Sequence, residues 1–349
     1  MSLALLLGSV NAACVNFRPP PVPIAASAAG DAPTPVWTAR AGGKLTGTVE
    51  VEDNTMYGGG MDRKVHAVDL TSGEVRWSTR LSGMVVGGVL LAGDTVFAAS
   101  SRPEGRIHAL HRATGKRIWR VSADPIAAPL AMIGGMLIAE TQRGDVLALD
   151  PTSGKQRWRR RVGSARGPAT PAGPGHLLIS TTDSLFRLSL GDGKITHRVR
   201  SPGTVVAWLP HGGALLAGTA DSQVVSIRPT DLHRNWTVGV DAPVLGAPAI
   251  LGDTLFLATR TGSVYRIDLA SEPHAERIAN LEWPVTAPIT ILRGQIILGG
   301  ADGTIRALRP DGSEIWRVRV WRPVELGPVP LADGLLAIGG NGDLHRYRR

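Results

Sequence analysis

The feature that most constrains this chain is a sequence module that returns about every 40 residues. The segment VHAVDLTSGEVRW at 65–77 recurs as IHALHRATGKRIW at 107–119 and as VLALDPTSGKQRW at 146–158. A fixed period of this length is typical of a repeat architecture, in which each unit packs on its neighbours. Weaker copies continue the series to the end of the chain. The residues that mark one shared position in the eight copies are Asp69, His111, Asp150, Ser189, Arg228, Asp268, Arg309 and Arg348.

Each module has the same order of strands and turns. Short apolar or alternating segments are separated by glycine-containing turns, such as Gly93-Asp94, and a turn of the form Asp-x-x-Ser/Thr-Gly precedes the last segment. The 43 Gly and 25 Pro among 349 residues leave little room for long helices, while 43% apolar residues suffice for a large core. The pattern predicts an all-β fold, an eight-bladed β-propeller of four-stranded antiparallel blades.

Tryptophan ends most of the modules. A large flat ring at this position can fill the space between neighbouring blades, and its indole N–H can bond to backbone. We therefore interpret these side chains as structural rather than as a base-stacking or ligand-binding set. The predicted structural blade tryptophans are Trp37, Trp77, Trp119, Trp158, Trp236 and Trp316.

The two ends of the repeat array complement each other. The last module stops at Arg349, after its third strand and without a tryptophan, whereas Trp37 precedes Trp77 by one period. We expect the segment around Trp37 to supply the outer strand of the last blade. Such closure removes the sheet edge that an open ring would expose.

The N-terminal segment predicts export. Residues 1–14 are apolar or small up to Cys14, and the run is too short to span a bilayer but fits a secretory signal. Its missing basic start is consistent with a natural start upstream of Met1. Cys14 is the candidate lipidation site; plain signal cleavage nearby, or a buried inert thiol, remain alternatives. Residues 15–35 are a Pro/Ala-rich linker, and 36–349 form the propeller.

The sequence motif V-x-A-L-D-x-x-[ST]-G-[KE]-x-x-W resembles the repeat of the quinoprotein-type, PQQ-like β-propellers. WD40 repeats are disfavoured, because no column tryptophan is followed by Asp. The export segment, the cysteine, the tether and the eight blades together are similar to the BamB family of outer-membrane assembly lipoproteins. That resemblance implies a non-catalytic scaffold, lipid-anchored on the periplasmic face of the outer membrane, monomeric within a complex and bound to the barrel subunit BamA or another envelope protein.

The alternative function is that of an exported PQQ-dependent dehydrogenase or another PQQ-like binding protein. By resemblance, such an enzyme would carry two adjacent cysteines and a calcium site, but Cys14 is the one cysteine of this chain. Glu50, Glu52 and Asp53 are the nearest acidic group, whereas calcium takes six to eight oxygen ligands. We therefore predict no catalytic residues, no cofactor and no cofactor-binding residues.

Three histidines share one position of the module on blades one, two and eight, namely His66, His108 and His345. Equivalent residues on packed sheets lie roughly 10 Å apart, whereas zinc ligands each lie about 2 Å from one ion. We therefore predict blade packing here and no metal site.

The formal net charge is +9, and 33 of the 38 basic residues are arginine. Nucleic acid is the usual partner of so basic a chain. No nucleic-acid motif is present, so we predict no nucleic-acid partner. Attraction to anionic lipid headgroups fits an exported chain better, and arginine as the favoured surface cation is the simplest interpretation.

Overall fold

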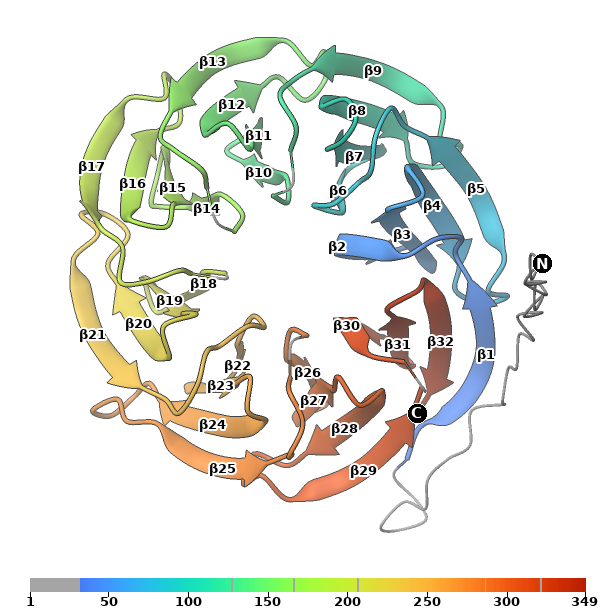
Figure 1. Ribbon diagram of the computed structural model, residues 1–349, viewed down its shortest axis with the longest axis vertical. Helices are drawn as coiled ribbons and strands as arrows, with labels where there is room; N and C mark the ends of the chain where they lie inside the picture. The colour runs from blue at the N-terminus through green and yellow to red at the C-terminus, as the bar shows by residue number, and fades with distance from the viewer. Residues whose placement is uncertain (1–31, 127, 166, 206, 286, 321) are drawn as a thin grey trace, which may run out of the picture.

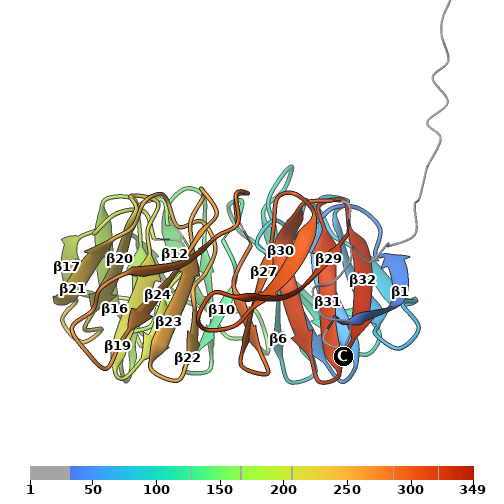
Figure 2. The same cartoon turned by 90° about the horizontal axis from the view of Figure 1, so that it is seen from below.

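The computed structural model describes residues 32–349, except 127, 166, 206, 286 and 321. These residues form 32 strands in eight four-stranded antiparallel sheets, and no helix occurs among them. The sheets stand around a common axis like the blades of a propeller (Figure 1). In side view the ring is a disc (Figure 2). The predicted eight-bladed all-β propeller is confirmed.

Blades 1 to 4 each run in chain order from an inner strand near the axis to an outer strand at the rim (Figure 1). Their strands are β2 Leu45–Glu52, β3 Thr55–Gly60, β4 Lys64–Asp69 and β5 Val75–Arg80; β6 Val89–Ala92, β7 Thr95–Ser100, β8 Arg106–His111 and β9 Arg117–Ser122; β10 Ala131–Ile133, β11 Met136–Glu140, β12 Asp145–Leu149 and β13 Gln156–Arg161; β14 Thr170–Pro171, β15 His176–Ser180, β16 Ser184–Ser189 and β17 Ile195–Arg200.

Blades 5 to 7 follow the same order, whereas blade 8 combines strands from both ends of the chain. Their strands are β18 Leu209–His211, β19 Ala214–Gly218, β20 Gln223–Ile227 and β21 Arg234–Gly239; β22 Ala249–Leu251, β23 Thr254–Ala258, β24 Ser263–Asp268 and β25 Glu276–Asn280; β26 Thr290–Leu292, β27 Gln295–Gly299, β28 Thr304–Leu308 and β29 Glu314–Arg319; β30 Val324–Leu331, β31 Gly334–Gly339, β32 Asp343–Arg348 and β1 Thr34–Arg40.

The ring closes through β1, which pairs antiparallel with β32 as the outer strand of blade 8 (Figure 1). Strand β1 begins at Thr34, two residues before the propeller boundary expected at 36, and a bulge separates Pro35 from Trp37. Proline lacks a backbone N–H, and an outer edge strand tolerates this loss. The expected closure by the N-terminal strand is confirmed.

The space between two neighbouring blades is called a seam and is numbered by its two blades, so that seam 8/1 lies between blades 8 and 1. The same side-chain contact repeats at four consecutive seams, 8/1, 1/2, 2/3 and 3/4. The tryptophan on the outer strand of one blade lies against a glycine in the last turn of the next blade, and its indole N–H donates to a backbone carbonyl there. Each of these glycines has a positive φ. A Cβ at Gly193, for example, would lie 2.6 Å from the Trp158 ring. The pairs are Trp37–Gly73, Trp77–Gly115, Trp119–Gly154 and Trp158–Gly193.

The other seams replace this contact in different ways. At seam 4/5 the tryptophan position holds exposed His197, and the facing glycine position holds Leu232, which has φ +62° and a buried side chain. The leucine supplies the apolar volume that the tryptophan would otherwise give. At seam 6/7 the tryptophan position holds Glu276, and Gly312 lies directly against the backbone of Ile278. At seam 7/8 the indole N–H of Trp316 donates to Gln295 within its own blade.

Candidate functional site

The six blade tryptophans line the seams, as described above for five of them, and Trp236 packs in the hydrophobic cluster at seam 5/6. Trp158 and Trp316 are buried, whereas the rings of the other four are partly exposed. Cys14, the candidate lipidation site, and the export and linker segments 1–31 lie outside the described residues.

The three histidines of the shared position have separate partners. His66 Nε2 lies 2.9 Å from Asp62 and its Nδ1 lies 2.8 Å from Ser78. Burial lowers the pKa of His66, and the charge of Asp62 opposes this in part. Burial, followed by the charges of nearby arginines, lowers the pKa of His108 to about 4, so this imidazole is neutral at pH 7. His345 lies 3.3 Å from Thr38 on the closing strand.

Acidic residues do not gather into a metal site in the described part of the chain. Within it, no group of three or more His, Cys, Asp or Glu side chains is placed to hold an ion. Glu50 lies on β2, and burial followed by the charge of Glu52 raises its pKa. Glu52 and Asp53 instead form ion pairs with Arg112 of blade 2. This acidic group therefore joins two blades.

Glu140 is a buried acid that no motif in the sequence marks. It ends β11, at a position that holds small residues in most blades, such as Gly59, Gly218 and Gly299. A Cβ on any of those glycines would meet a valine of the segment that follows the outer strand of the same blade, but the segment after blade 3 has Ala165 at the equivalent position. Burial raises the pKa of Glu140 to about 8, and the backbone N–H of Ala169 opposes this only in part.

Because the folded pKa of Glu140 lies above its ordinary value of 4.5, the folded state binds this proton more tightly than the unfolded state. The associated stability is complete below about pH 4.5 and is lost as the pH rises towards 8. We expect the free energy of unfolding to fall by up to ~1.4 kcal/mol per pH unit in that window, and Glu140→Gln to remove this slope. Urea unfolding at pH 5, 6, 7 and 8 measures it.

The matched control for this experiment is Glu104→Gln, because the Glu104 side chain is 57% exposed. This control should retain the wild-type dependence on pH. Parallel stability curves for the wild type and Glu140→Gln would show that the buried carboxyl does not couple folding to protonation.

A cavity of about 340 Å³ lies at the outer part of seam 6/7. Its walls come from the loop that leads from β25 to β26 and from the second half of blade 7, and one of them is the indole of Trp283, which is 51% exposed. The lining residues are Trp283, Asp302, Thr304, Arg306, Arg317 and Arg319.

The cavity residues form a charged network. Arg306 is 7% exposed and donates to Asp302 at 2.8 Å. Glu314 accepts from Arg317 at 2.7 Å and lies 3.7 Å from Arg306. Burial raises the pKa of Asp302, but its hydrogen bonds to Thr304 and the charge of Arg306 outweigh burial, so the net shift is downward. The network therefore holds fixed charges of both signs at neutral pH.

No motif in the sequence points to the cavity residues. Arg306 occupies the same position of the module as His66 and His108, and Trp283 lies in a loop where other blades have glycine, alanine or a charged residue. A position-by-position comparison of the eight modules would have marked both as exceptions. Their convergence on one cavity depends on the packing of blade 6 against blade 7.

The closed ring of eight four-stranded blades with tryptophan at the seams defines a β-propeller of the PQQ-like class. A family model described as "Outer membrane protein assembly factor BamB" matches residues 28–170 and 103–231, which together span more than half of the chain. The chain belongs to this family. None of its described elements is a helix long and apolar enough to cross a membrane.

Two curated relatives show the range of sequence similarity. The BamB protein of Yersinia pestis is 24% identical over 229 residues, which are 58% of this chain and 56% of that protein. The DNA damage-responsive serine/threonine-protein kinase RqkA of Deinococcus radiodurans is 33% identical over 93 residues, 26% of this chain and 14% of the kinase. The chain thus spans about half, or much less, of the length of these relatives.

Solved structures share the fold. BamB from Moraxella catarrhalis superposes with a TM-score of 0.76 at 17% identity, over 91% of this chain and all of that chain. Quinohemoprotein alcohol dehydrogenase from Comamonas testosteroni gives a TM-score of 0.73 at 13% identity, over 90% of this chain and 76% of that chain. At such identities these likenesses establish the architecture alone.

Proposed function

We propose that this chain is a non-catalytic scaffold of the cell envelope that takes part in the assembly of outer-membrane β-barrel proteins and binds BamA or another envelope protein. The observation that carries the proposal is the membership of a closed eight-bladed ring in the BamB family. The tryptophan contacts at the seams make the ring a rigid scaffold that carries the loops between strands. Loops on a rigid scaffold commonly carry binding residues.

The chemistry of the described residues supports a scaffold over an enzyme. His108 and Glu140, two buried groups whose pKa values shift strongly, lie at different blade seams rather than together in a cleft. Catalytic acids and bases are arranged around a shared reacting centre. The similarity to a quinohemoprotein dehydrogenase is one of fold alone. The experiment below therefore also measures PQQ-dependent oxidation.

Affinity purification of the tagged chain from solubilised membranes tests the scaffold function. We expect a barrel-assembly subunit to be recovered in stoichiometric amounts, and no dye-linked alcohol oxidation when PQQ and calcium are added. Failure to recover such a subunit, together with PQQ-dependent oxidation, would overturn the scaffold in favour of the dehydrogenase.

The same preparation tests the proposed anchor at Cys14. If Cys14 carries a lipid, Cys14→Ala releases the protein from the membrane fraction into the soluble fraction of the envelope. Unchanged membrane association of the Cys14→Ala protein would refute lipidation at this residue. The propeller residues are untouched by this substitution, so folding serves as an internal control.

A further inference from the structure

One position of the module changes from a small residue to arginine in three blades. It lies on the third strand from the axis, directly opposite the tryptophan position of the outer strand. A guanidinium that is buried at such a position needs an opposite charge or hydrogen-bond acceptors. The small residues are Ala67, Ala109, Ala148, Ser226 and Ala307, and the arginines are Arg187, Arg266 and Arg346.

Two of these arginines bind a carboxylate of their own blade. Arg266 donates to Glu276 at 2.7 Å, and Glu276 lies directly opposite it on β25. Arg346 donates at 2.8 Å to Asp333, which lies in the turn between β30 and β31. The module therefore has two places from which an acid reaches this guanidinium, the opposite outer strand and the inner turn.

Blade 4 has no acid at either place. His197 lies opposite Arg187, and the inner turn between β14 and β15 is Ala-Gly-Pro-Gly at 172–175. Among the described residues, no carboxylate forms an ion pair with Arg187. The charge of Asp231 in blade 5 acts on Arg187 from farther away, but its two oxygens accept from Arg228 at 2.9 and 2.6 Å.

The Arg187 side chain is buried and only partly hydrogen-bonded. It is 8% exposed, and burial lowers its pKa, an effect that the charge of Asp231 opposes in part. Its Nε donates to the carbonyl of Ala172 at 3.2 Å, and its Nη1 donates to the hydroxyl of Thr196 at 3.2 Å. A guanidinium has five N–H donors. The described residues therefore leave three of them unused, including both donors of Nη2.

The Nη2 group of Arg187 lies beside an open position at seam 4/5. A Cβ added to Gly173 would lie 3.9 Å from Nη2 and 3.9 Å from the methyl carbon of Thr230 in blade 5. Chain neighbours aside, no other heavy atom of the described residues lies within 4 Å of that point. A small group from outside can therefore approach Nη2 between blades 4 and 5 without displacing a side chain.

From these observations we propose that seam 4/5 binds a carboxylate from outside the chain, which Arg187 holds beside Gly173 and Thr230. This carboxylate takes the place of the acid that blades 6 and 8 supply themselves. Arginine binds carboxylates through two parallel hydrogen bonds, for which Nη1 and Nη2 retain donors. The carboxylate belongs to a free organic acid or to an acidic side chain of a polypeptide, and the second source rests on the proposed scaffold function.

A carboxylate fits this site better than a phosphate group. A phosphate monoester carries about 1.5 to 2 negative charges at pH 7 and has three strong acceptor oxygens. Arg187 is the one cationic group that the described residues place beside the Gly173 position without a carboxylate partner. Blades 6 and 8 match the same arginine with a single carboxylate.

NMR spectroscopy of the purified full chain, labelled with nitrogen-15 arginine, tests the proposal at pH 7. The Nε–H of Arg187 is buried and hydrogen-bonded, so its signal is protected from exchange with water. Arg187→Lys identifies this signal by its absence. The titrants, at constant ionic strength, are sodium acetate, acetyl-Gly-Glu-Gly-amide and its twin with Gln in place of Glu. We expect acetate and the Glu peptide to shift the signal saturably and the Gln peptide to leave it unchanged.

Position 197 provides the matched variants. His197→Glu places a carboxylate opposite Arg187, as Glu276 lies opposite Arg266, and should occupy the guanidinium from within the chain. Binding of acetate and of the Glu peptide should then weaken about tenfold or more. His197→Gln adds no charge and should change the affinity less than twofold. Because His197 is exposed, both variants keep the fold, and the conclusion does not depend on the stability of Arg187→Lys.

The relative affinities distinguish the two sources of the carboxylate. Equal affinity for acetate and the Glu peptide assigns the site to free organic acids, whereas tighter binding of the Glu peptide assigns it to a polypeptide side chain. Since these measurements use only the purified chain, carboxylate binding without recovery of a barrel-assembly subunit would reject the proposed function and keep the assignment of seam 4/5.

Four results would overturn the proposal. They are no saturable shift with acetate or the Glu peptide up to about 50 mM, an equal shift with the Gln peptide, unchanged binding in His197→Glu, and tighter binding of inorganic phosphate than of acetate. The third result would place the carboxylate elsewhere on the chain, and the fourth would assign seam 4/5 to phosphate groups.

Discussion

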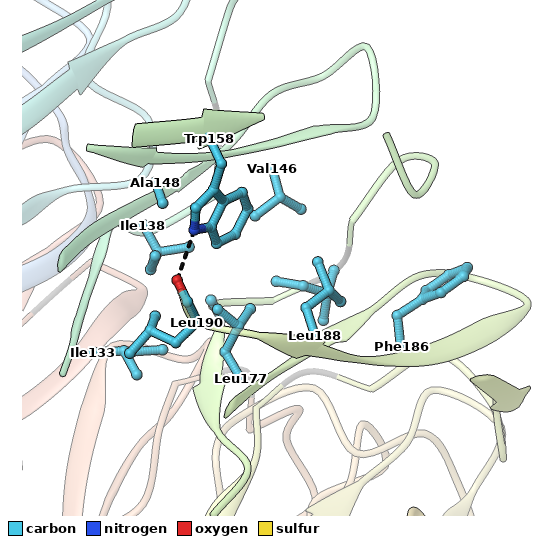
Figure 3. Close-up of a cluster of buried hydrophobic side chains, with 11 residues drawn as sticks. Ile133, Ile138, Val146, Ala148, Trp158, Leu177, Phe186, Leu188 and Leu190 are labelled. Atoms are coloured by element: carbon cyan, nitrogen blue, oxygen red, sulfur yellow. Dashed lines mark hydrogen bonds between the residues drawn. The ribbon is translucent and has the colours of Figure 1, made fainter. Parts of the chain in front are cut away.

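Replacement of Trp158 by alanine should lower the free energy of unfolding by about 3–5 kcal/mol, the usual cost of truncating a buried large aromatic side chain. Trp158 is 7% exposed and lies in the core between blades 3 and 4, among Ile138, Leu177 and Leu188 (Figure 3). Its indole N–H donates to the carbonyl of Leu190 at 2.7 Å. The alanine variant therefore loses apolar contacts and leaves a carbonyl without this donor.

Trp283→Ala is the matched control, because the same chemical change is made at a ring that is 51% exposed. Its free energy of unfolding should stay within about 1 kcal/mol of wild type. Urea unfolding followed by circular dichroism measures both variants. Equal losses for the two would show that the seam tryptophan is not a specific element of stability.

A double-mutant cycle separates the seam contact from general loss of volume. Gly193→Ala places a Cβ 2.6 Å from the Trp158 ring, at a backbone φ of +68° that disfavours alanine. The backbone penalty is present with or without the ring, whereas the clash is present only with it. Gly193→Ala should therefore cost more in the wild type than in Trp158→Ala, and equal costs would contradict the proposed contact.

The fold could be predicted because its signals are local and are repeated eight times. Glycines such as Gly73 and Gly154 have positive φ in the structure, and the turn carboxylate of Asp69 accepts backbone N–H groups from the two residues that follow Leu70. The closure was predictable for a different reason. Trp37 lies one period before Trp77, and the last module lacks its outer strand. Both arguments need only the period and the backbone preferences of single residues.

The exceptions could not be predicted in the same way, because each depends on side chains from two blades. Leu232 occupies a position with φ +62° where blades 1 to 4 have glycine, and its burial is explained by the absence of a tryptophan at exposed His197 of blade 4. Glu140 also depends on two blades, since its side chain has space at seam 3/4 only because the small residue Ala165 lies in the next loop. The cavity at Trp283 is the third case, and it also requires three arginines of blade 7.

Removal of strand β1 should have a larger effect than any single substitution. A chain that begins at Ala41 lacks the pairing of β1 with β32 and the contact of Trp37 with Gly73. It also exposes the long edge of β32, and unpaired edges promote association between chains. We expect oligomers in size-exclusion chromatography and loss of a single cooperative thermal transition. The chain that begins at Ala32 keeps every described contact and serves as the control.

The closing strand β1 is also linked to blade 1 through the backbone carbonyl oxygen of Leu70, in addition to its pairing with β32. The carbonyl of Leu70 in blade 1 accepts the indole N–H of Trp37 at 2.9 Å and a guanidinium N–H of buried Arg346 at 2.7 Å. Arg346 also donates to Asp333, so both ends of the chain are tied to blade 1 at one point. Arg346→Met should therefore reproduce part of the truncation, with a loss of about 1–3 kcal/mol, because it removes the hydrogen bonds of a charged donor while the Asp333 side chain is 43% exposed. A monomeric truncated chain with an unchanged melting temperature would show that the ring is held by its other seven seams alone.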